Sequence, residues 1–321
     1  MTFRGFACAF FGAFALVFIV PVFAQERAGR PDRGSTTAWV FKPATPGIYT
    51  PPNRPHWKLP EVLAKHAGSG NWAEPVIKDE HFFVQYISLG LAGKTPTSLQ
   101  VDTIIWFIVK RGQLRFNIKG QTPFVASKDF IVQIPMRTPY SMETVGDEPS
   151  VRLEVRIADG ATAYPVDENP NPPQAPAGYV AVKALIGRGP EAYADGVKPY
   201  LDFQKEYVHA EKPRPGGGPF YVTNARGFVA VNRSQGVPPA EPTNLGHFHL
   251  GLNEFWMVME GEVDFQLEGI PDLIRAYDGD VVYAPRGSFH RASNGGSGMS
   301  TRIPMGGVID SGAAITLIDK K

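Results

Sequence analysis

Short apolar runs recur along the chain at intervals of about ten residues, and this recurrence constrains the fold more than any other feature. Examples are Phe82–Tyr86, Ile104–Val109 and Phe130–Ile134, each followed or preceded by Gly, Pro, Asp or Asn. Apolar runs of this length between turn-forming residues are typical of β-strands. The 321 residues include 34 Gly and 30 Pro, which disfavour long helices. The sequence therefore predicts an all-β protein.

The first 24 residues have the pattern of a secretory signal peptide, removed before Gln25. Arg4 precedes an apolar stretch from Phe6 to Val20, and a small-residue end at Ala24 follows. The alternative is an uncleaved membrane anchor, because the stretch is almost long enough to span a bilayer. Cleavage is favoured by the polar segment that comes next. We therefore expect a secreted or periplasmic protein.

Composition excludes several classes of function. The only cysteine, Cys8, lies in the leader, so the mature chain has neither disulfides nor thiolate ligands. The leader contains one basic residue and no acidic one, which leaves 31 basic against 31 acidic residues. This balance gives no electrostatic attraction to nucleic acid, or to membranes once the leader is cleaved. Stability must come from a packed core, and 43% hydrophobic residues can build one.

The β-rich texture falls into two blocks. We predict an N-terminal extended arm over 25–80, a first barrel over 81–157, a Pro-rich linker over 158–217 and a second barrel over 218–321. The blocks share a pattern of an apolar strand, a charged-Gly turn and an alternating strand, at 105–116 and again at 254–265. A second match joins 135–140 to 285–290. Duplication explains both matches better than a coincidence of two generic hairpins.

Four side chains of the second block could gather around one ion. His247 and His249 are two residues apart, so on a strand both imidazoles point to the same face. Glu254 follows a glycine-containing bend that can return its carboxylate to that face. A much later strand supplies His290 as a fourth candidate.

These residues belong to two motifs that together resemble the signature of the cupin superfamily. The first is His-X-His-X4-Glu-X6-Gly over His247–Gly261, and the second is Gly-X5-Pro-X-Gly-X2-His-X3-Asn over Gly279–Asn294. One departure is Glu241, which stands where the family usually has a glycine. The resemblance implies two tandem jelly-roll barrels, also called double-stranded β-helices, behind the arm.

The resemblance also implies a metal site. Its ligands would be His247, His249, Glu254 and His290, which suit a divalent transition metal such as Cu, Fe, Mn, Ni or Zn. The alternative is a metal-free barrel whose interior polar groups satisfy one another. The matching positions of the first block are Ser98, Gln100, Ile105 and Tyr140, so we expect one metal per chain, in the second barrel. An organic ligand in the first barrel stays open.

For function, the resemblance implies a metal-dependent enzyme acting on a small molecule. A dioxygenase-type oxidoreductase with a phenolic or organic-acid substrate is favoured, with Glu254 as the catalytic base. The alternatives are a metal-dependent decarboxylase, lyase or isomerase, and a non-catalytic binding cupin. Cupin barrels often pair, so a homodimer is an expected assembly.

The other histidines and the aromatic pair after Glu254 do not extend the predicted site. The isolated histidines, His56, His66, His81 and His209, are expected to be surface or structurally paired residues. Phe255 and Trp256 are expected to belong to the core.

Overall fold

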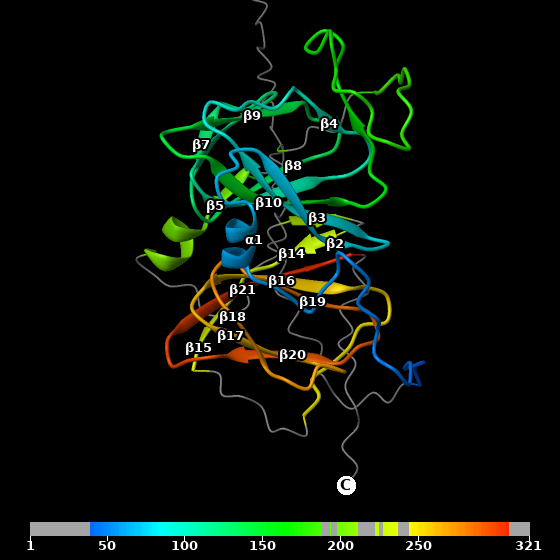
Figure 1. The fold of residues 1–321 in the computed structure, drawn as a ribbon, viewed down its shortest axis with the longest axis vertical. Coiled ribbons are helices and arrows are strands. Elements are labelled where there is room, and N and C mark those ends of the chain that lie inside the picture. The colour runs from blue at the N-terminus through cyan, green and yellow to red at the C-terminus, as the bar shows by residue number, and fades with distance from the viewer. Residues whose placement is uncertain are drawn as a thin grey trace, which may run out of the picture. The chain divides into compact units, whose positions relative to one another are not determined.

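The computed structural model describes residues 39–187, 193, 198–210, 222–224, 227–236 and 244–307. The predicted leader lies outside these residues and stays a prediction. The described chain is built from strands, which confirms the all-β prediction (Figure 1). Two short helices accompany them, α1 at Leu59–Lys65 and the π-helix η1 at Gln204–Val208. Within the described ranges, no helix has the length and apolar character of a membrane span.

The first barrel is made of three sheets. The largest has six antiparallel strands in the order β12-β8-β5-β10-β3-β2, and a three-stranded sheet has the order β7-β6-β9. A two-stranded ladder, β11-β4, completes it. The strands are β2 (Trp72–Lys78), β3 (Phe82–Leu89), β4 (Leu99–Gln100), β5 (Ile105–Arg111), β6 (Gln113–Ile118), β7 (Phe124–Ala126), β8 (Phe130–Ile134), β9 (Tyr140–Val145), β10 (Ser150–Ile157), β11 (Thr162–Ala163) and β12 (Tyr200–Asp202).

The second barrel has the same plan. Its larger sheet has seven strands in the order β1-β19-β16-β21-β14-β13, with β15 also paired to β21. A three-stranded sheet, β18-β17-β20, lies opposite. The strands are β1 (His56–Trp57), β13 (Val222–Asn224), β14 (Gly227–Val229), β15 (Asn232–Gln235), β16 (Glu254–Glu260), β17 (Val263–Leu267), β18 (Ile274–Ala276), β19 (Val281–Ala284), β20 (His290–Asn294) and β21 (Met299–Gly306).

The register of the central strands shows that the two barrels are equivalent. Strand β5 lies between β8 and β10, just as β16 lies between β19 and β21. Ile105 and Glu254 begin the two central strands at the same position. Both strands have a bulge near the C-terminal end, where Lys110 and Met259 have no paired residue on the neighbouring strand. A shared irregularity of this kind supports duplication, because bulges are specific features of a fold.

Alternation along the strands divides the apolar residues between separate cores. Odd positions of β5 from Ile105 onward face the interior of the first barrel, where they pack with Leu114 and Phe116. Even positions, such as Trp106, face a core shared by the two larger sheets. In that shared core Phe82 packs edge-on against Phe255, with 5.4 Å between ring centroids.

The predicted arm and linker contribute strands to both barrels. From the arm, β2 extends the larger sheet of the first barrel, whereas β1 pairs with β19 of the second. From the linker region, β12 pairs with β8. The helix α1 also belongs to the arm. The domain boundaries themselves stay a prediction.

Candidate metal centre

The structure brings the four predicted ligands together at one end of the second barrel. Glu254 begins β16 and His290 begins β20. His247 and His249 lie on the segment just before β16, and His247 pairs with His290 through backbone bonds of 3.1 and 2.8 Å. One ligand atom from each residue lies within 4.8 Å of those of the other three. The four side chains therefore converge on one point.

The carboxylate of Glu254 lies at the centre of this cluster. Its Oε2 atom is 3.0 Å from Nε2 of His249 and 3.0 Å from Nε2 of His290. The His247 ring completes the group, with its centroid 4.6 Å from that of His290. Glu254 and His290 are buried, and the other two histidines are half-buried, so the cluster is accessible from one side.

The proton positions test whether these residues fit a metal. Nδ1 of His290 is 3.0 Å from the carbonyl oxygen of Ser288, so Nδ1 carries the proton and donates it. In a neutral imidazole, Nε2 then presents a lone pair to Glu254 Oε2, which is also an acceptor. Such an arrangement requires a second proton or a cation. A divalent transition metal satisfies both groups, and the backbone carbonyl that orients the ring is typical of metal-binding histidines. The residues fit a metal.

The electrostatics favour the protonation states that bind metal. Burial, together with the neighbouring His290, lowers the pKa of His247 to about 4, so this imidazole is neutral at pH 7. For Glu254, burial acts to raise the pKa, but the interactions with His249 and His290 outweigh it and hold the pKa well below its usual range. At neutral pH the cluster therefore has an ionised carboxylate.

Gly246 explains how the chain enters the site. Its φ of +81° lies in the left-handed region, and a Cβ there would be 2.1 Å from the carbonyl oxygen of His290. The glycine thus allows the close backbone approach that pairs His247 with His290. Glu241, which stands where the family usually has a glycine, lies outside the described residues.

Replacing Gly246 by alanine is expected to disturb the centre. The left-handed backbone alone costs a side chain about 1–2 kcal/mol, and the Cβ would push His290 away from His247. We expect weaker metal binding, measured by titration, and a lower free energy of unfolding in urea. Gly120 is the matched control, because it has φ +82° with nothing within 4 Å of its Cβ position. If Gly120→Ala weakens metal binding as much as Gly246→Ala, the close-approach explanation is wrong.

Arg302 is a residue of this site that the sequence reasoning missed. It lies on β21 opposite Val258. Its side chain is on the opposite face of the strand from Ile303 and Met305, which pack in the core shared by the two barrels. Burial lowers the pKa of its guanidinium, opposed by the charge of Glu254, and Arg302 in turn acts on His247. Arg302 thus acts electrostatically on two residues of the cluster, Glu254 and His247. Its counterpart is Arg152, which holds the same place opposite Val109, so aligning the last strands of the two repeats would have revealed it.

The first barrel preserves the frame of this site but not the ligands. Ser98 pairs with Tyr140 through two backbone bonds of 2.9 Å, as His247 pairs with His290. Gln100 accepts a bond from Arg137 N, as His249 accepts one from Gly287 N. Ile105 occupies the place of Glu254. This set lacks a carboxylate and an imidazole, so it does not fit a transition metal.

The remaining residues singled out by sequence lie elsewhere. Nε2 of His56 is 3.0 Å from Asp280, and Nε2 of His66 is 2.8 Å from Glu74. Phe255 lies in the core shared by the barrels. Trp256 lines the interior of the second barrel, with its ring centroid 5.1 Å from that of His290. It therefore forms a wall of the centre as well as part of the core.

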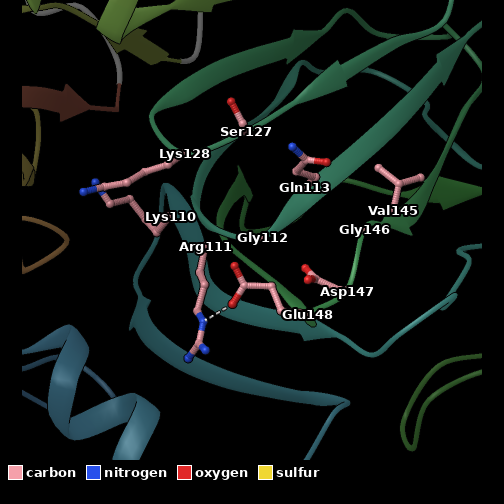
Figure 2. Close-up of a pocket in the computed structure, with 10 residues that line it drawn as sticks. All are labelled: Lys110, Arg111, Gly112, Gln113, Ser127, Lys128, Val145, Gly146, Asp147 and Glu148. Atoms are coloured by element: carbon pink, nitrogen blue, oxygen red, sulfur yellow. Dashed lines mark hydrogen bonds and ion pairs between the residues drawn. The ribbon is translucent and has the colours of Figure 1, made fainter.

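A surface pocket of the first barrel is separate from this centre (Figure 2). It lies where β5 turns into β6, and it shares no residue with the His/Glu cluster. Figure 2 shows Arg111 directed at Glu148, with 2.7 Å between Nε and Oε2, whereas Lys110 and Lys128 point together to the other side. Both lysines contact Asp278. Ion pairs account for these charges.

Comparison with known proteins identifies the fold. No protein-family model matches the sequence, and no curated protein sequence matches it either. Among solved structures, the chain is similar to salicylate 1,2-dioxygenase from Pseudaminobacter salicylatoxidans, with 14% identity and a TM-score of 0.55 over 84% of this chain and 87% of that one. An oxalate decarboxylase variant from Bacillus subtilis is 15% identical, with a TM-score of 0.49 over 90% and 89%.

A third similar solved structure is described as a cupin. It is a Cupin 2 conserved barrel domain protein from Leptotrichia buccalis, 9% identical, with a TM-score of 0.49 over 78% of this chain and 94% of that one. The likeness to the dioxygenase is greater, with a TM-score of 0.55. The chain has the two-barrel cupin fold, and the resemblance found in the sequence is confirmed at the level of the fold.

Proposed function

We propose that the second barrel binds one divalent transition metal and that the chain is a dioxygenase-type oxidoreductase acting on a small phenolic or organic acid. The observation that carries the proposal is the convergence of three imidazoles and one carboxylate within 4.8 Å inside a cupin barrel. The cation of Arg302 next to this cluster supports an anionic substrate. A non-catalytic small-molecule-binding role is disfavoured, because such a protein does not need the complete set of metal ligands that this barrel retains.

Each ligand has a place in this proposal. The metal would be held by His247, His249, His290 and Glu254. The carbonyl oxygen of Ser288 orients the His290 ring, and the backbone bonds between His247 and His290 hold these two residues side by side. When bound, a metal of this kind polarises a substrate oxygen as a Lewis acid and, if redox-active, supports reaction with dioxygen. Glu254 is the one carboxylate among these four residues, and it would accept the proton of a substrate hydroxyl.

Arg302 would orient the substrate. A guanidinium binds a carboxylate through paired hydrogen bonds, and burial strengthens such bonds. With its carboxylate on Arg302, a substrate would present its remaining polar group to the His/Glu cluster. Trp256 and Val258 on the neighbouring strand provide an apolar wall that suits an aromatic or aliphatic body. These features favour hydroxy acids over uncharged phenols.

Oxygen uptake tests the reaction class. The metal-loaded protein should be supplied with salicylate and gentisate, since one solved relative is a salicylate 1,2-dioxygenase and a variant of it was solved with gentisate, at a TM-score of 0.52. Oxalate serves as the comparison acid. We expect dioxygen consumption with a hydroxy acid. Release of carbon dioxide without oxygen uptake would instead establish the decarboxylase alternative. If neither activity is detected with any of the loaded metals, the enzyme proposal is contradicted.

Replacing Arg302 by methionine is expected to raise KM for an acidic substrate by about 10- to 100-fold. A hydrogen bond to a charged group contributes about 1.5–3 kcal/mol, which corresponds to that range. Metal content should stay close to that of the unmodified protein, because Arg302 is not a ligand. Arg302→Lys should recover part of the loss. Arg115→Met is the control, since Arg115 pairs with Glu143 on the surface of the first barrel. An unchanged KM in Arg302→Met would contradict the anchoring role.

A further inference from the structure

The interior of the first barrel contains a polar cluster at the place where the second barrel has its metal ligands. Its members are Ser98, Gln100, Tyr140, Arg152 and Glu154, all buried. Tyr140 pairs with Ser98 through the backbone. Burial and the nearby charge of Glu154 raise the pKa of its hydroxyl well above the usual range, opposed by Ser98, Arg152 and Gln100. Burying polar groups costs free energy unless they have partners. An interior packed only with apolar side chains would not contain this polar cluster.

Arg152 has unused hydrogen-bonding capacity. Its side chain is 3% exposed, yet Nε and Nη1 have no hydrogen-bond partner. The third nitrogen, Nη2, lies 3.6 Å from Glu154 Oε2, which is too long for a hydrogen bond. Glu154 also accepts a bond from Gln85, at 3.2 Å. A buried guanidinium with two unpartnered nitrogens is costly unless an acceptor occupies the space beside it.

Gln100 adds an unused acceptor to the same cluster. Its Nε2 donates to Thr162 Oγ1 at 3.0 Å, whereas its Oε1 is buried without a partner. The cluster thus offers free donors on Arg152 and a free acceptor on Gln100. A single bound molecule that satisfies both must carry an anionic acceptor group and a hydroxyl or similar donor.

We propose that the first barrel binds a small hydroxycarboxylate anion, with its carboxylate on Arg152 and its hydroxyl donating to Gln100. Apolar residues around the cluster, among them Ile105, Phe107 and Met142, pack the interior of the barrel, so the site favours a small ligand. The carboxylate of Glu154 lies 3.6 Å from Nη2 of Arg152, so the unpartnered Nε and Nη1 are the donors available to the ligand. This site stands independently of the metal centre and of the proposed enzymatic function.

Gln100 also joins the cluster to a short ladder. It belongs to β4, which pairs with β11 over two residues on each strand. Because Gln100 Nε2 is bonded to Thr162 of β11, the Gln100 side chain would hold both the ladder and the ligand.

Glycolate binding to the full-length protein tests the proposal, with acetate as the probe that lacks the hydroxyl. Carbon-13-labelled probes can be titrated and followed by NMR. The Arg302→Met protein without added metal serves as the reference, because the second barrel then lacks its own cation for anions. We expect glycolate to bind this reference and to bind more tightly than acetate, by about fivefold, since the hydroxyl adds one neutral hydrogen bond.

Two variants assign the site. Adding Arg152→Met to the reference should weaken glycolate binding by about tenfold or more, because a charge-assisted bond is lost. Adding Gln100→Leu should remove the preference for glycolate over acetate while leaving acetate binding in place, and this ratio remains informative if Arg152→Met does not fold. If neither anion binds the reference, only water occupies the cluster and the proposal is wrong. If both bind equally before and after Gln100→Leu, the hydroxyl assignment is wrong.

Discussion

Replacing His290 by alanine is expected to weaken metal binding so far that the protein no longer retains a full equivalent of metal. Complete four-ligand sites contribute about 10–16 kcal/mol of apparent binding free energy for zinc, so one ligand accounts for roughly 3 kcal/mol, or about 100-fold in affinity. His290 has a second role, because its backbone pairs with that of His247. The loss is measured by elemental analysis after dialysis against a weak chelator.

The matched control is the same position in the first barrel. Tyr140 pairs with Ser98 as His290 pairs with His247, so Tyr140→Phe perturbs an equivalent place without touching the metal centre. It should leave the metal content unchanged. His290→Ala protein that retains a full equivalent of metal would show that the ion binds elsewhere, and the proposed centre would be wrong. His247→Ala should behave like His290→Ala, since both supply one imidazole to the cluster.

The second large effect is expected on stability, from Lys110→Met. Nζ of Lys110 lies 2.5 Å from Asp129 Oδ1, with both side chains almost fully buried, and it also contacts the carboxylate of Asp278 in the second barrel. Removing one partner of a buried ion pair leaves the other charge uncompensated and costs about 3–5 kcal/mol. The loss should be visible as a lower free energy of unfolding in urea, followed by tryptophan fluorescence.

The structure itself suggests why methionine is the informative replacement. Met259 holds the equivalent bulge position in the second barrel, where it packs in the shared core. The frame therefore accepts methionine sterically, and the expected loss comes from the charge of Asp129. Adding Asp129→Asn should restore most of the stability. Asparagine keeps an oxygen that can accept the bond from Gln204 Nε2, which is 2.7 Å from Oδ2 of Asp129, and it tolerates the φ of +68° at this position.

A surface pair provides the contrast. Lys94 lies 3.2 Å from Glu143 with most of its side chain exposed, so Lys94→Met should change stability by no more than about 1 kcal/mol. Equal effects at positions 94 and 110 would mean that burial of the Lys110 pair has no energetic consequence.

Local patterns carried much of the prediction. The all-β fold followed from the spacing of the apolar runs, because strand periodicity is a property of a few consecutive residues. The grouping of His247 with His249 followed in the same way. The π-helix over Gln204–Val208 and the two-residue strand at His56–Trp57 have no such signal. The latter exists because β19 offers it a free edge, which the arm reaches only in the folded chain.

The two arginines show the limit of sequence reasoning most clearly. Arg152 and Arg302 stand in ordinary alternating strands, and nothing adjacent to them indicates a site. The register of β10 on β5, and of β21 on β16, places these arginines opposite Val109 and Val258, on the inward face of each sheet. The unpartnered nitrogens of Arg152 likewise become visible only when its neighbours are known.

By itself, the sequence determined the strand texture, the duplication and the four candidate ligands, since each depends on residue types at short spacing. The tertiary structure decided which distant strands enclose those ligands and which cations face each interior. It also decided that the barrels share one apolar core, with Trp106 and Phe255 on its two sides. The physical reason is that a strand has two faces, and their assignment to interior or interface is settled only when the sheets pack.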